Sequence, residues 1–390
     1  MISPDAWAHQ YVSMSNQPWA LPLPVSPSPF FNVDNRGLVF GLEPHFPCCT
    51  VNHPQGLPKF LAGSWMITRK SLGKVRMKAG EEWQDELVHG MLGPSHVKTI
   101  LREMKGGTEI LNAVKVRCET AYPFEQVLVY HITAKEPLDI SLRIPSWVDL
   151  ETSSLRVHDR SVGPLSRQHP PQITLVSDTS LRPAPRTRLH ALRLPAGYST
   201  FTLTLGAALH IEERNPGMVA VHYGPLLYAL DLRPVSHWVP PVEWQSHAEL
   251  PAWRWMGGGA HDEVVLGTSP WNVAIDLGSL RIGEERKRDG GGAASGDEQF
   301  FMPENGPTEI VEITVMACEV EWEVERGVPA PAPVVLQSRA GEGDAGTRQE
   351  LNREKDCIGP MRRVRFVPFG QAKVRMTELP VVDLGWGGRR

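Results

Sequence analysis

The stretch that decides the fold is LDISLRI, residues 138–144, in which Leu and Ile occupy the even positions and Asp, Ser and Arg the odd ones. A period of two places the apolar side chains on one face of a β-strand. The same alternation occurs at Val114–Glu119 and, with threonine on one face, at Thr200–Leu205. Turn signals at Tyr122-Pro123 and Ile144-Pro145 separate such runs. The pattern predicts an antiparallel β-sandwich.

The composition is typical of a folded, loop-rich β protein. The 390 residues exceed one ordinary core, so we expect two or three domains. Hydrophobic residues make up 41% and charged residues 22%, and the 35 glycines and 35 prolines favour β structure over a helical bundle. The net charge of −4 predicts no nucleic-acid partner. The lack of an apolar run near ~18 residues predicts no membrane span.

The first residues do not indicate a cellular location. Met1–Trp7 lacks the basic region and apolar stretch of a secretory signal. The sequence also contains no Asn-x-Ser/Thr sequon with an allowed middle residue. No signal peptide is therefore predicted in this chain, and its localisation stays open.

The N-terminal region follows another pattern. Trp7, Tyr11 and Met14 are spaced by four and three residues, as on one face of a short helix. A proline-rich loop follows, and a second helix is predicted over Pro58–Met66, with proline in its first turn. Two helices of this length cannot enclose a core, so this region indicates a domain that is only partly present.

One long strand is predicted near the C-terminus, over Ile310–Glu325. Its apolar residues occupy odd positions at first and even positions from Val320 onward. Such a change of face predicts a β-bulge or a bend near Met316–Cys318.

The cysteines of the sequence form an odd and scattered set, which predicts no disulfide framework. Only one feature of the set requires a chemical explanation, the adjacent pair at positions 48 and 49. The five cysteines are Cys48, Cys49, Cys118, Cys318 and Cys357.

Three interpretations of Cys48-Cys49 follow from chemistry alone. The pair fits two small apolar residues in a tight loop. It also fits a zinc site, with Glu43, His45 and His53 as nearby donors, although the spacing matches no standard zinc finger. The third interpretation is a nucleophilic cysteine whose thiol pKa is lowered by a metal or a cation. The residues alone leave all three open.

The segment around the pair resembles a known signature. Residues 40–60 read FGLEPHFPCCTVNHPQGLPKF and look like the signature of fungal proteins related to glycoside hydrolase family 127, the β-L-arabinofuranosidase group. The resemblance continues over nearly the whole chain. Further motifs recur in the same order, namely Gly93-Pro94-Ser95, Tyr122-Pro123-Phe124, Arg143-Ile144-Pro145-Ser146-Trp147, Gly224-Pro225-Leu226-Leu227-Tyr228, Pro368-Phe369-Gly370 and Lys373–Pro380.

The resemblance implies a retaining glycosidase that depends on zinc. By its motif, Cys48 is the candidate nucleophile, which forms a thioglycosyl intermediate, and Cys48 and Cys49 are candidate zinc ligands. Zinc deprotonates a bound thiol, so a thiolate can replace the carboxylate nucleophile usual in retaining glycosidases. Asn52, His53 and Gln55 are candidate substrate-binding residues, or else they cap the helix that follows. The implied partner is an arabinose-containing glycan or glycoside.

Pattern and resemblance together predict a mixed, mainly β fold in three parts. Residues 1–80 are predicted to be the C-terminal remnant of an (α/α)6 six-hairpin catalytic barrel. Residues 81–235 are predicted to form a β-sandwich domain. Residues 236–390 are predicted to form a second β-rich domain with flexible insertions, whose last strand, at about 362–384, returns to the first sandwich. The oligomeric state stays open.

The sequence departs from the family pattern upstream of the pair. In the family, a Glu-x-Cys zinc element and the acid/base glutamate precede the pair, but no Glu-x-Cys occurs among the 47 residues before Cys48. We therefore expect a chain that begins part-way through its catalytic domain and is inactive alone. Two other hypotheses are a non-catalytic β-sandwich module that binds glycans or partners, and a structural zinc protein completed by Glu43, His45 or His53.

Overall fold

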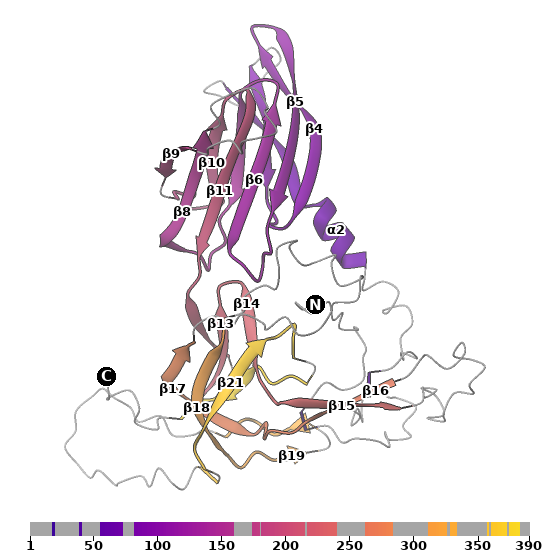
Figure 1. Cartoon of the computed structure of the whole chain (residues 1–390), viewed down its shortest axis with the longest axis vertical. Helices are drawn as coiled ribbons and strands as arrows, with labels where there is room; N and C mark the ends of the chain where they lie inside the picture. The colour runs from indigo at the N-terminus through magenta and orange to yellow at the C-terminus, as the bar shows by residue number, and fades with distance from the viewer. Residues whose placement is uncertain are drawn as a thin grey trace, which may run out of the picture. The chain divides into compact units, whose positions relative to one another are not determined.

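The computed structural model describes about three fifths of the chain, and within that part the protein is mainly β, with one helix, α2 (Gly56–Ala62) (Figure 1). The described residues form two compact units. We call those within Pro54–Ala208 the sandwich unit, and those within Met1–His53 and Leu209–Arg390 the C-terminal unit. No described helix is long and apolar enough to cross a membrane. The described residues are 18–19, 39–40, 55–72, 82–159, 174–179, 181–214, 217–239, 262–283, 311–325, 328–333, 357–358, 360–372 and 374–382.

The sandwich unit is a single curled sheet with the strand order β10-β7-β3-β4-β5-β6-β11-β8-β9, and β2 pairs with β3. Strand β3 joins the two halves, because Trp83 and Gln84 pair with β4 whereas Leu87–His89 pair with β7. One core cluster contains residues from both halves, which therefore pack face to face. The strands are β2 (Trp65–Ser71), β3 (Trp83–His89), β4 (Ser95–Lys105), β5 (Thr108–Glu119), β6 (Val127–Ala134), β7 (Leu138–Arg143), β8 (Asp149–Asp159), β9 (Thr174–Thr179), β10 (Leu189–Leu194) and β11 (Gly197–Gly206).

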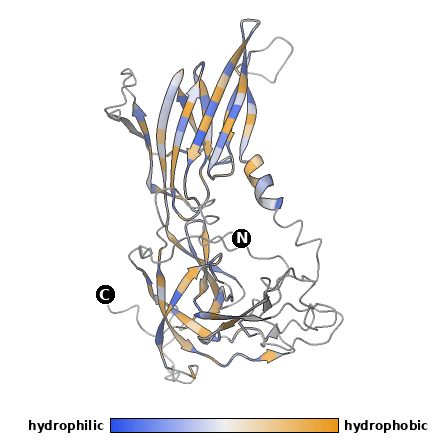
Figure 2. Ribbon diagram, turned by 45° about the vertical axis from the view of Figure 1, so that its right-hand side comes forward, coloured by the Kyte–Doolittle hydropathy of each residue, from blue (hydrophilic) through white to orange (hydrophobic). Residues whose placement is uncertain are grey.

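The alternation in the sequence decides which face of this sheet is buried. Leu138, Ile140 and Leu142 of β7 are almost completely buried, as are Val114 and Val116 of β5. The residues between those of β5 are exposed, and Figure 2 shows the resulting alternation of apolar and polar positions along the strands. Each such side chain contributes roughly 1.5–3 kcal/mol through burial. The predicted strands with one buried face are confirmed.

The helix predicted over Pro58–Met66 is partly wrong. Helix α2 ends at Ala62, and Trp65 and Met66 begin strand β2. The change occurs at Gly63 and Ser64, where the Gly63 amide donates to the Lys59 carbonyl and the Ser64 hydroxyl to the Leu61 carbonyl. The apolar residues that suggested a longer helix instead belong to a strand paired with β3.

The C-terminal unit contains a seven-stranded antiparallel sheet with the order β12-β13-β14-β21-β18-β17, on which β22 pairs with β13. A three-stranded sheet, β1-β16-β15, and the pair β19-β20 accompany it. The strands are β1 (Val39–Phe40), β12 (Leu209–Glu213), β13 (Met218–Tyr223), β14 (Leu226–Leu230), β15 (Pro234–Val239), β16 (Asp262–Gly267), β17 (Val273–Ile282), β18 (Ile313–Glu319), β19 (Val324–Glu325), β20 (Val328–Pro329), β21 (Arg362–Pro368) and β22 (Glu378–Pro380).

The strand predicted over Ile310–Glu325 is shorter than expected. Strand β18 covers only Ile313–Glu319, and the chain leaves the sheet before β19. The buried face changes at Ala317 and Cys318, which are both buried although they are neighbours. The predicted change of face is therefore present, and the register shift with β17 falls in the partner strand.

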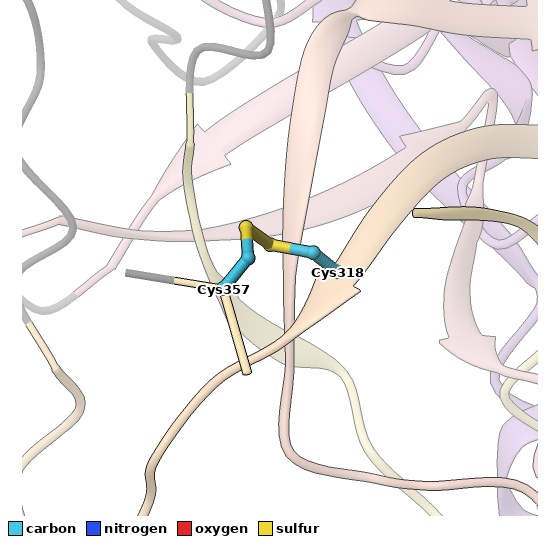
Figure 3. The surroundings of a disulfide bond; sticks show 2 residues. All are labelled: Cys318 and Cys357. Carbon is cyan, nitrogen blue, oxygen red and sulfur yellow. A yellow bond between two sulfur atoms is a disulfide. The ribbon is translucent and has the colours of Figure 1, made fainter. Parts of the chain in front are cut away.

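The sequence predicted no disulfide framework, and the structure contains one disulfide that it did not foresee. Cys318, in β18, is bonded to Cys357, and their Cα atoms are 5.6 Å apart (Figure 3). The two residues are 39 positions apart, but β18 pairs with β21 and the Ile358 amide donates to the Glu319 carbonyl. The pairing of the strands thus brings together two cysteines whose spacing in the sequence does not indicate a bond.

The fold class is established only in its coarser part, the mainly β architecture of the described residues. Residues 1–80, predicted as the barrel remnant, are described only at 18–19, 39–40 and 55–72, so the barrel stays a prediction. Strand β21, within the predicted returning strand, pairs with β14 (Leu226–Leu230). The three-part domain division likewise stays a prediction.

Candidate functional site

Most of the predicted site residues lie outside the described part of the chain. These are Cys48, Cys49, Asn52 and His53. The alternative zinc donors Glu43 and His45 also lie outside it. Their roles therefore stay predictions. Within the described part, no group of three or more His, Cys, Asp or Glu side chains could hold a metal ion.

Gln55 is the one predicted substrate-binding residue that the structure describes. It stands at the N-cap of α2 with φ −68° and ψ −17°, and its side chain makes no capping hydrogen bond. The helix-capping alternative is therefore not borne out for Gln55. Substrate binding by this exposed residue stays a prediction.

Helix α2 leads directly into the sandwich through Trp65. The Trp65 indole nitrogen donates to the Ser95 hydroxyl at 2.9 Å, and its ring stacks on the His89 imidazole, with centroids 4.1 Å apart and planes 2° apart. A partly buried indole with a partner for its N–H contributes both apolar area and a defined orientation. Packing rather than sugar stacking is therefore the role of Trp65.

The strand register shows which loops share one end of the sandwich unit. Trp65, which begins β2, pairs with His89, which ends β3. Ser95, which begins β4, pairs with Cys118 near the end of β5. Because β7 runs parallel to β3, it ends on the same side. The loops after β3, β5 and β7 therefore open at one end.

Three of the motifs noted in the sequence lie in or border these loops. They are Gly93–Ser95, Tyr122–Phe124 and Arg143–Trp147, and α2 enters at the same end. We call this end, with the loops at 90–94, 120–126 and 144–148, the motif-bearing end. Residues far apart in the sequence thus share one edge of the unit.

The loop at 120–126 is held by its own side chains and contains a cis Tyr122-Pro123 bond. The Thr120 hydroxyl donates to the Val127 carbonyl at 2.7 Å and accepts from the Tyr122 amide at 3.0 Å. The Gln126 side-chain amide donates to the Pro123 carbonyl at 3.2 Å. Burial raises the pKa of Tyr122, so its phenol stays neutral. These contacts fix the backbone of the loop.

The loop at 144–148 is held by Arg188. This residue has φ 56°, and its guanidinium donates to the Ile144 and Pro145 carbonyls at 3.1 and 2.7 Å. In return, the Ile144 amide donates to the Arg188 carbonyl at 2.8 Å. Arg188 thus binds the backbone of the loop, and Trp147 packs against the core.

A neutral polar cluster lies in the core beneath the motif-bearing end. His89 is completely buried, and its Nδ1 is 2.8 Å from the Tyr130 hydroxyl. Burial lowers the pKa of His89 to about 4, and burial raises the pKa of Tyr130 well above its ordinary value. Burial likewise raises the pKa of the Cys118 thiol to about 12. Since nucleophilic cysteines react as thiolates, Cys118 is a structural residue.

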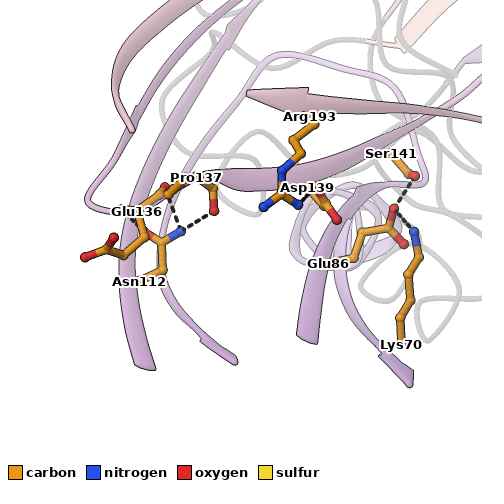
Figure 4. A network of polar contacts seen from close by, with 8 residues as sticks. All are labelled: Lys70, Glu86, Asn112, Glu136, Pro137, Asp139, Ser141 and Arg193. Carbon is orange, nitrogen blue, oxygen red and sulfur yellow. Dashed lines mark hydrogen bonds and ion pairs between the residues drawn. The ribbon is translucent and has the colours of Figure 1, made fainter. Parts of the chain in front are cut away.

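Two consecutive buried carboxylates lie on β3. Glu86 accepts from the Lys70 ammonium at 2.6 Å and from the Ser141 hydroxyl at 2.5 Å (Figure 4). Asp85 accepts from Arg69 at 2.9 Å. Neighbouring strand residues face opposite sides of a sheet, so these carboxylates cannot act together on one substrate as a glycosidase pair. Both are structural ion pairs.

The opposite end of the sandwich has a small hollow. The Asn112 side-chain amide donates to the Glu136 and Pro137 carbonyls at 3.0 and 3.3 Å, and its oxygen accepts from the Glu136 amide at 2.9 Å (Figure 4). The hollow beside it is only about large enough for a water molecule. Its acidic neighbour Asp139 is paired with Arg193 at 2.7 Å.

Sequence reasoning missed the buried polar residues of β3. The segment DELVH at 85–89 has no strict alternation, because both faces of β3 are buried. A signal was nevertheless present: an acidic pair and a histidine in an otherwise apolar stretch require buried partners.

Comparison with known proteins gives similarity only at the level of solved structures. No family model matches the chain, and no curated protein matches it. A GH127 β-L-arabinofuranosidase from Geobacillus stearothermophilus T6 aligns over 86% of this chain at a TM-score of 0.43 and 12% identity. A glycoside hydrolase aligns over 77% at 0.35 and 13%, and a GH127 β-arabinofuranosidase over 76% at 0.34 and 10%. The aligned parts cover 37%, 37% and 36% of those chains, so this chain spans little more than a third of their length.

Proposed function

We propose that this chain is related to the zinc-dependent retaining β-L-arabinofuranosidases and that Cys48 stands at the position of their nucleophile. The proposal is carried by the segment at residues 40–60, with its adjacent cysteines, and by the later motifs in matching order. Its substrate class is a glycoside, with arabinofuranose as the proposed sugar.

The arrangement of the motif-bearing end supports this proposal. Gly93–Ser95, Tyr122–Phe124 and Arg143–Trp147 are separated by 26 and 18 residues, yet strand register brings them to one end of one unit. Matches arising by chance would be expected at either end. Helix α2, which overlaps the last residues of the cysteine segment, also enters there.

The chemistry follows from the residues of the segment. The Cys48 thiolate attacks the anomeric carbon and forms a thioglycosyl bond while the bond to the leaving group breaks, and water then hydrolyses the thioglycoside with overall retention. Two adjacent thiols suit zinc, so Cys48 and Cys49 would hold the ion, which lowers the pKa of their thiols. Asn52, His53 and Gln55 would donate to, or accept from, sugar hydroxyls.

We also propose that the 390 residues by themselves do not cleave glycosides. They contain no Glu-x-Cys before the pair, and no glutamate in the acid/base role is assigned among them. General acid–base catalysis contributes about 10²–10⁴-fold in rate. The test is hydrolysis of an aryl β-L-arabinofuranoside by the purified chain, with Cys48→Ser and the buried Cys118→Ser as matched variants. Cleavage by the natural chain would contradict the proposed inactivity. If Cys48→Ser abolished that cleavage and Cys118→Ser preserved it, the role of Cys48 as the nucleophile would be supported.

A structural zinc site is the second candidate, because Glu43, His45 and His53 lie within five residues of the pair. Zinc content separates the two candidates. Stoichiometric zinc that is lost on His45→Ala or His53→Ala favours a structural site. Weak zinc binding that depends on Cys48 and Cys49 alone favours the incomplete glycosidase site.

A further inference from the structure

The sandwich unit has an outward face that neither the core nor the motif-bearing end uses. It is formed by the side chains of β4, β5, β6 and β11 that point away from the core. Register places four of them in one row across the strands: Lys98 opposite Lys115, Lys115 opposite Thr133, and Thr133 opposite Tyr198. With strands about 4.8 Å apart, the row is about 14 Å long.

The lysines of this row are not neutralised. Lys98 and Lys115 are direct cross-strand neighbours, and like charges in that position are destabilising. Lys135 adds a third positive charge at the end of β6, where its amide donates to the Ala113 carbonyl. In the described part of the chain, no carboxylate pairs with any of the three.

The acidic residues of the same face already have cationic partners. Glu119 pairs with Arg117 at 2.8 Å, and Glu109 pairs with Arg102 at 3.5 Å. The three lysines are therefore a local excess of positive charge in a chain whose net charge is −4.

Tyr198 provides a flat aromatic surface at the end of the row. Its hydroxyl lies 2.7 Å from Nδ1 of His131 and 3.2 Å from the hydroxyl of Thr200, two residues further along the same strand. Because the hydroxyl reaches a neighbour on the same face, the ring lies along the sheet rather than standing away from it. Thr200 is itself tied to the backbone, donating to the Tyr130 carbonyl. The ring is 39% exposed, so this surface is both accessible and preorganised.

Between the lysines the face is hollowed. Lys98, Ile100, Lys115, Thr133 and Lys135 are among the residues that line a shallow, open depression. Ala113 also lines it, and Ile100 is 56% exposed. The depression thus combines three ammonium groups, one hydroxyl and a small apolar surface.

We propose that this surface, formed by Lys98, Lys115, Lys135, Thr133 and Tyr198, binds an acidic glycan that contains uronic acid residues. Sugar rings present an apolar face that stacks on an aromatic ring, and their carboxylates accept hydrogen bonds from lysine ammonium groups. Lysine ammonium groups act as separate point charges and suit anionic groups spaced along a chain, and the aromatic ring beside them favours a ligand that also has an apolar sugar face. The 14 Å row, about three inter-strand spacings long, fits an oligosaccharide rather than a monosaccharide.

The test is calorimetric titration of the full chain with a galacturonic acid oligosaccharide and with its fully methyl-esterified form. The two ligands share their rings and differ in charge. We expect the acid form to bind and the ester to bind at least about tenfold more weakly, with the affinity of the acid form falling as salt is raised. Polyphosphate is the comparison polyanion and is expected to bind more weakly than the acid glycan.

Variants test which residues bind the acidic glycan. The double variant Lys98→Gln/Lys115→Gln should weaken binding about tenfold, and Tyr198→Ala about fivefold. Lys105→Gln, an exposed lysine at the other end of β4, is the matched control and should leave the affinity unchanged. Cys48→Ser should also leave it unchanged, so this proposal stands apart from the glycosidase proposal. The proposal is overturned by the absence of binding, by equal binding of acid and ester, by polyphosphate binding that Tyr198→Ala does not affect, or by a double variant that binds like the natural chain.

Discussion

The two ends of the sandwich unit are closed by different physical means. At the motif-bearing end, side chains of defined type hold the loops: Thr120 and Arg188 bond backbone carbonyls, and Trp65 stacks on His89. The opposite end, which we call the hairpin end, contains the turns at 106–107, 135–137 and 195–197. There Gly106 and Gly107 close a two-residue hairpin with φ 56° and 78°, as type I′ turns require.

This difference indicates at which end of the sheet the identity of the residues matters for more than closing the sheet. A hairpin can close a sheet with two glycines, so side-chain and arginine clamps are not needed for that purpose alone. Asn112 also clamps a turn at the hairpin end, but at the motif-bearing end side chains hold two separate loops, and α2 enters there. Such an arrangement is expected of a surface that supports a site. Substitutions at the two ends test this contrast.

The largest effect is expected for Trp65→Ala at the motif-bearing end. The variant loses the stack on His89 and the hydrogen bond to Ser95, and the free energy of unfolding should fall by about 3 kcal/mol. Denaturant unfolding measures it. Leu111→Ala, at a 49% exposed position, is the control and should change stability by less than about 0.5 kcal/mol. Equal losses of unfolding free energy in the two variants would contradict the expectation that the packed residue stabilises the fold more than the exposed one.

The next largest effect is a loss of folding stability at acid pH, which arises from His89. Its pKa is about 4 in the folded chain and 6.5 in the unfolded one, so the unfolded chain takes up the proton first as the pH falls. The folded state should therefore lose roughly 3 kcal/mol between pH 6.5 and pH 4, with no contribution from this group above that range. In His89→Asn, the unfolding free energy should depend less on pH in this window. An unchanged pH dependence would contradict a buried neutral His89.

At the hairpin end, Asn112→Ala should cost about 2 kcal/mol, because its three hydrogen bonds to the Glu136–Pro137 turn are lost and buried backbone groups lose their partner. Thermal or denaturant unfolding measures the loss. Asn112→Asp keeps the acceptor for the Glu136 amide but not the donor, so an intermediate loss is expected. A neutral Asn112→Ala variant would show that the turn closes without it.

The smallest effect is expected for Gly197→Ala, also at the hairpin end. Gly197 has φ 98°, and a Cβ there would meet no atom within 4 Å. The cost is therefore conformational only and should be about 1 kcal/mol. The same denaturant experiment measures it. A loss as large as that of Trp65→Ala would mean that the hairpin end depends on side-chain fit as strongly as the motif-bearing end.

The sandwich strands could be predicted because their burial is one-sided. In β5, β7 and β11, one face meets the core, and the alternation of residue types records it. Strand β3 could not be assigned in this way, because both of its faces are buried and Asp85, Glu86 and His89 interrupt the pattern. The end of α2 was missed because Trp65 and Met66 continue its apolar run, although they already belong to strand β2.

Pairings between distant residues lay beyond sequence reasoning. The Cys318–Cys357 disulfide depends on the pairing of β18 with β21, and spacing in the chain carries no trace of it. The gathering of the three motifs at one end likewise depends on register, although each motif was visible by itself. The cysteine segment was found by its sequence, and the roles of Cys48 and Cys49 stay predictions.

Alkylation of individual cysteines tests the central claim most directly, namely that the reactive, zinc-binding thiols are those of Cys48 and Cys49. The intact protein is treated with iodoacetamide at neutral pH, with and without added zinc, and each cysteine is followed by peptide mass spectrometry. We predict that Cys48 and Cys49 are modified and that zinc slows their modification. Cys118, buried with a pKa of about 12, should stay unmodified in both conditions, and Cys318 and Cys357 should stay bonded to each other. Modification of Cys48 and Cys49 at rates that zinc does not change would contradict the claim.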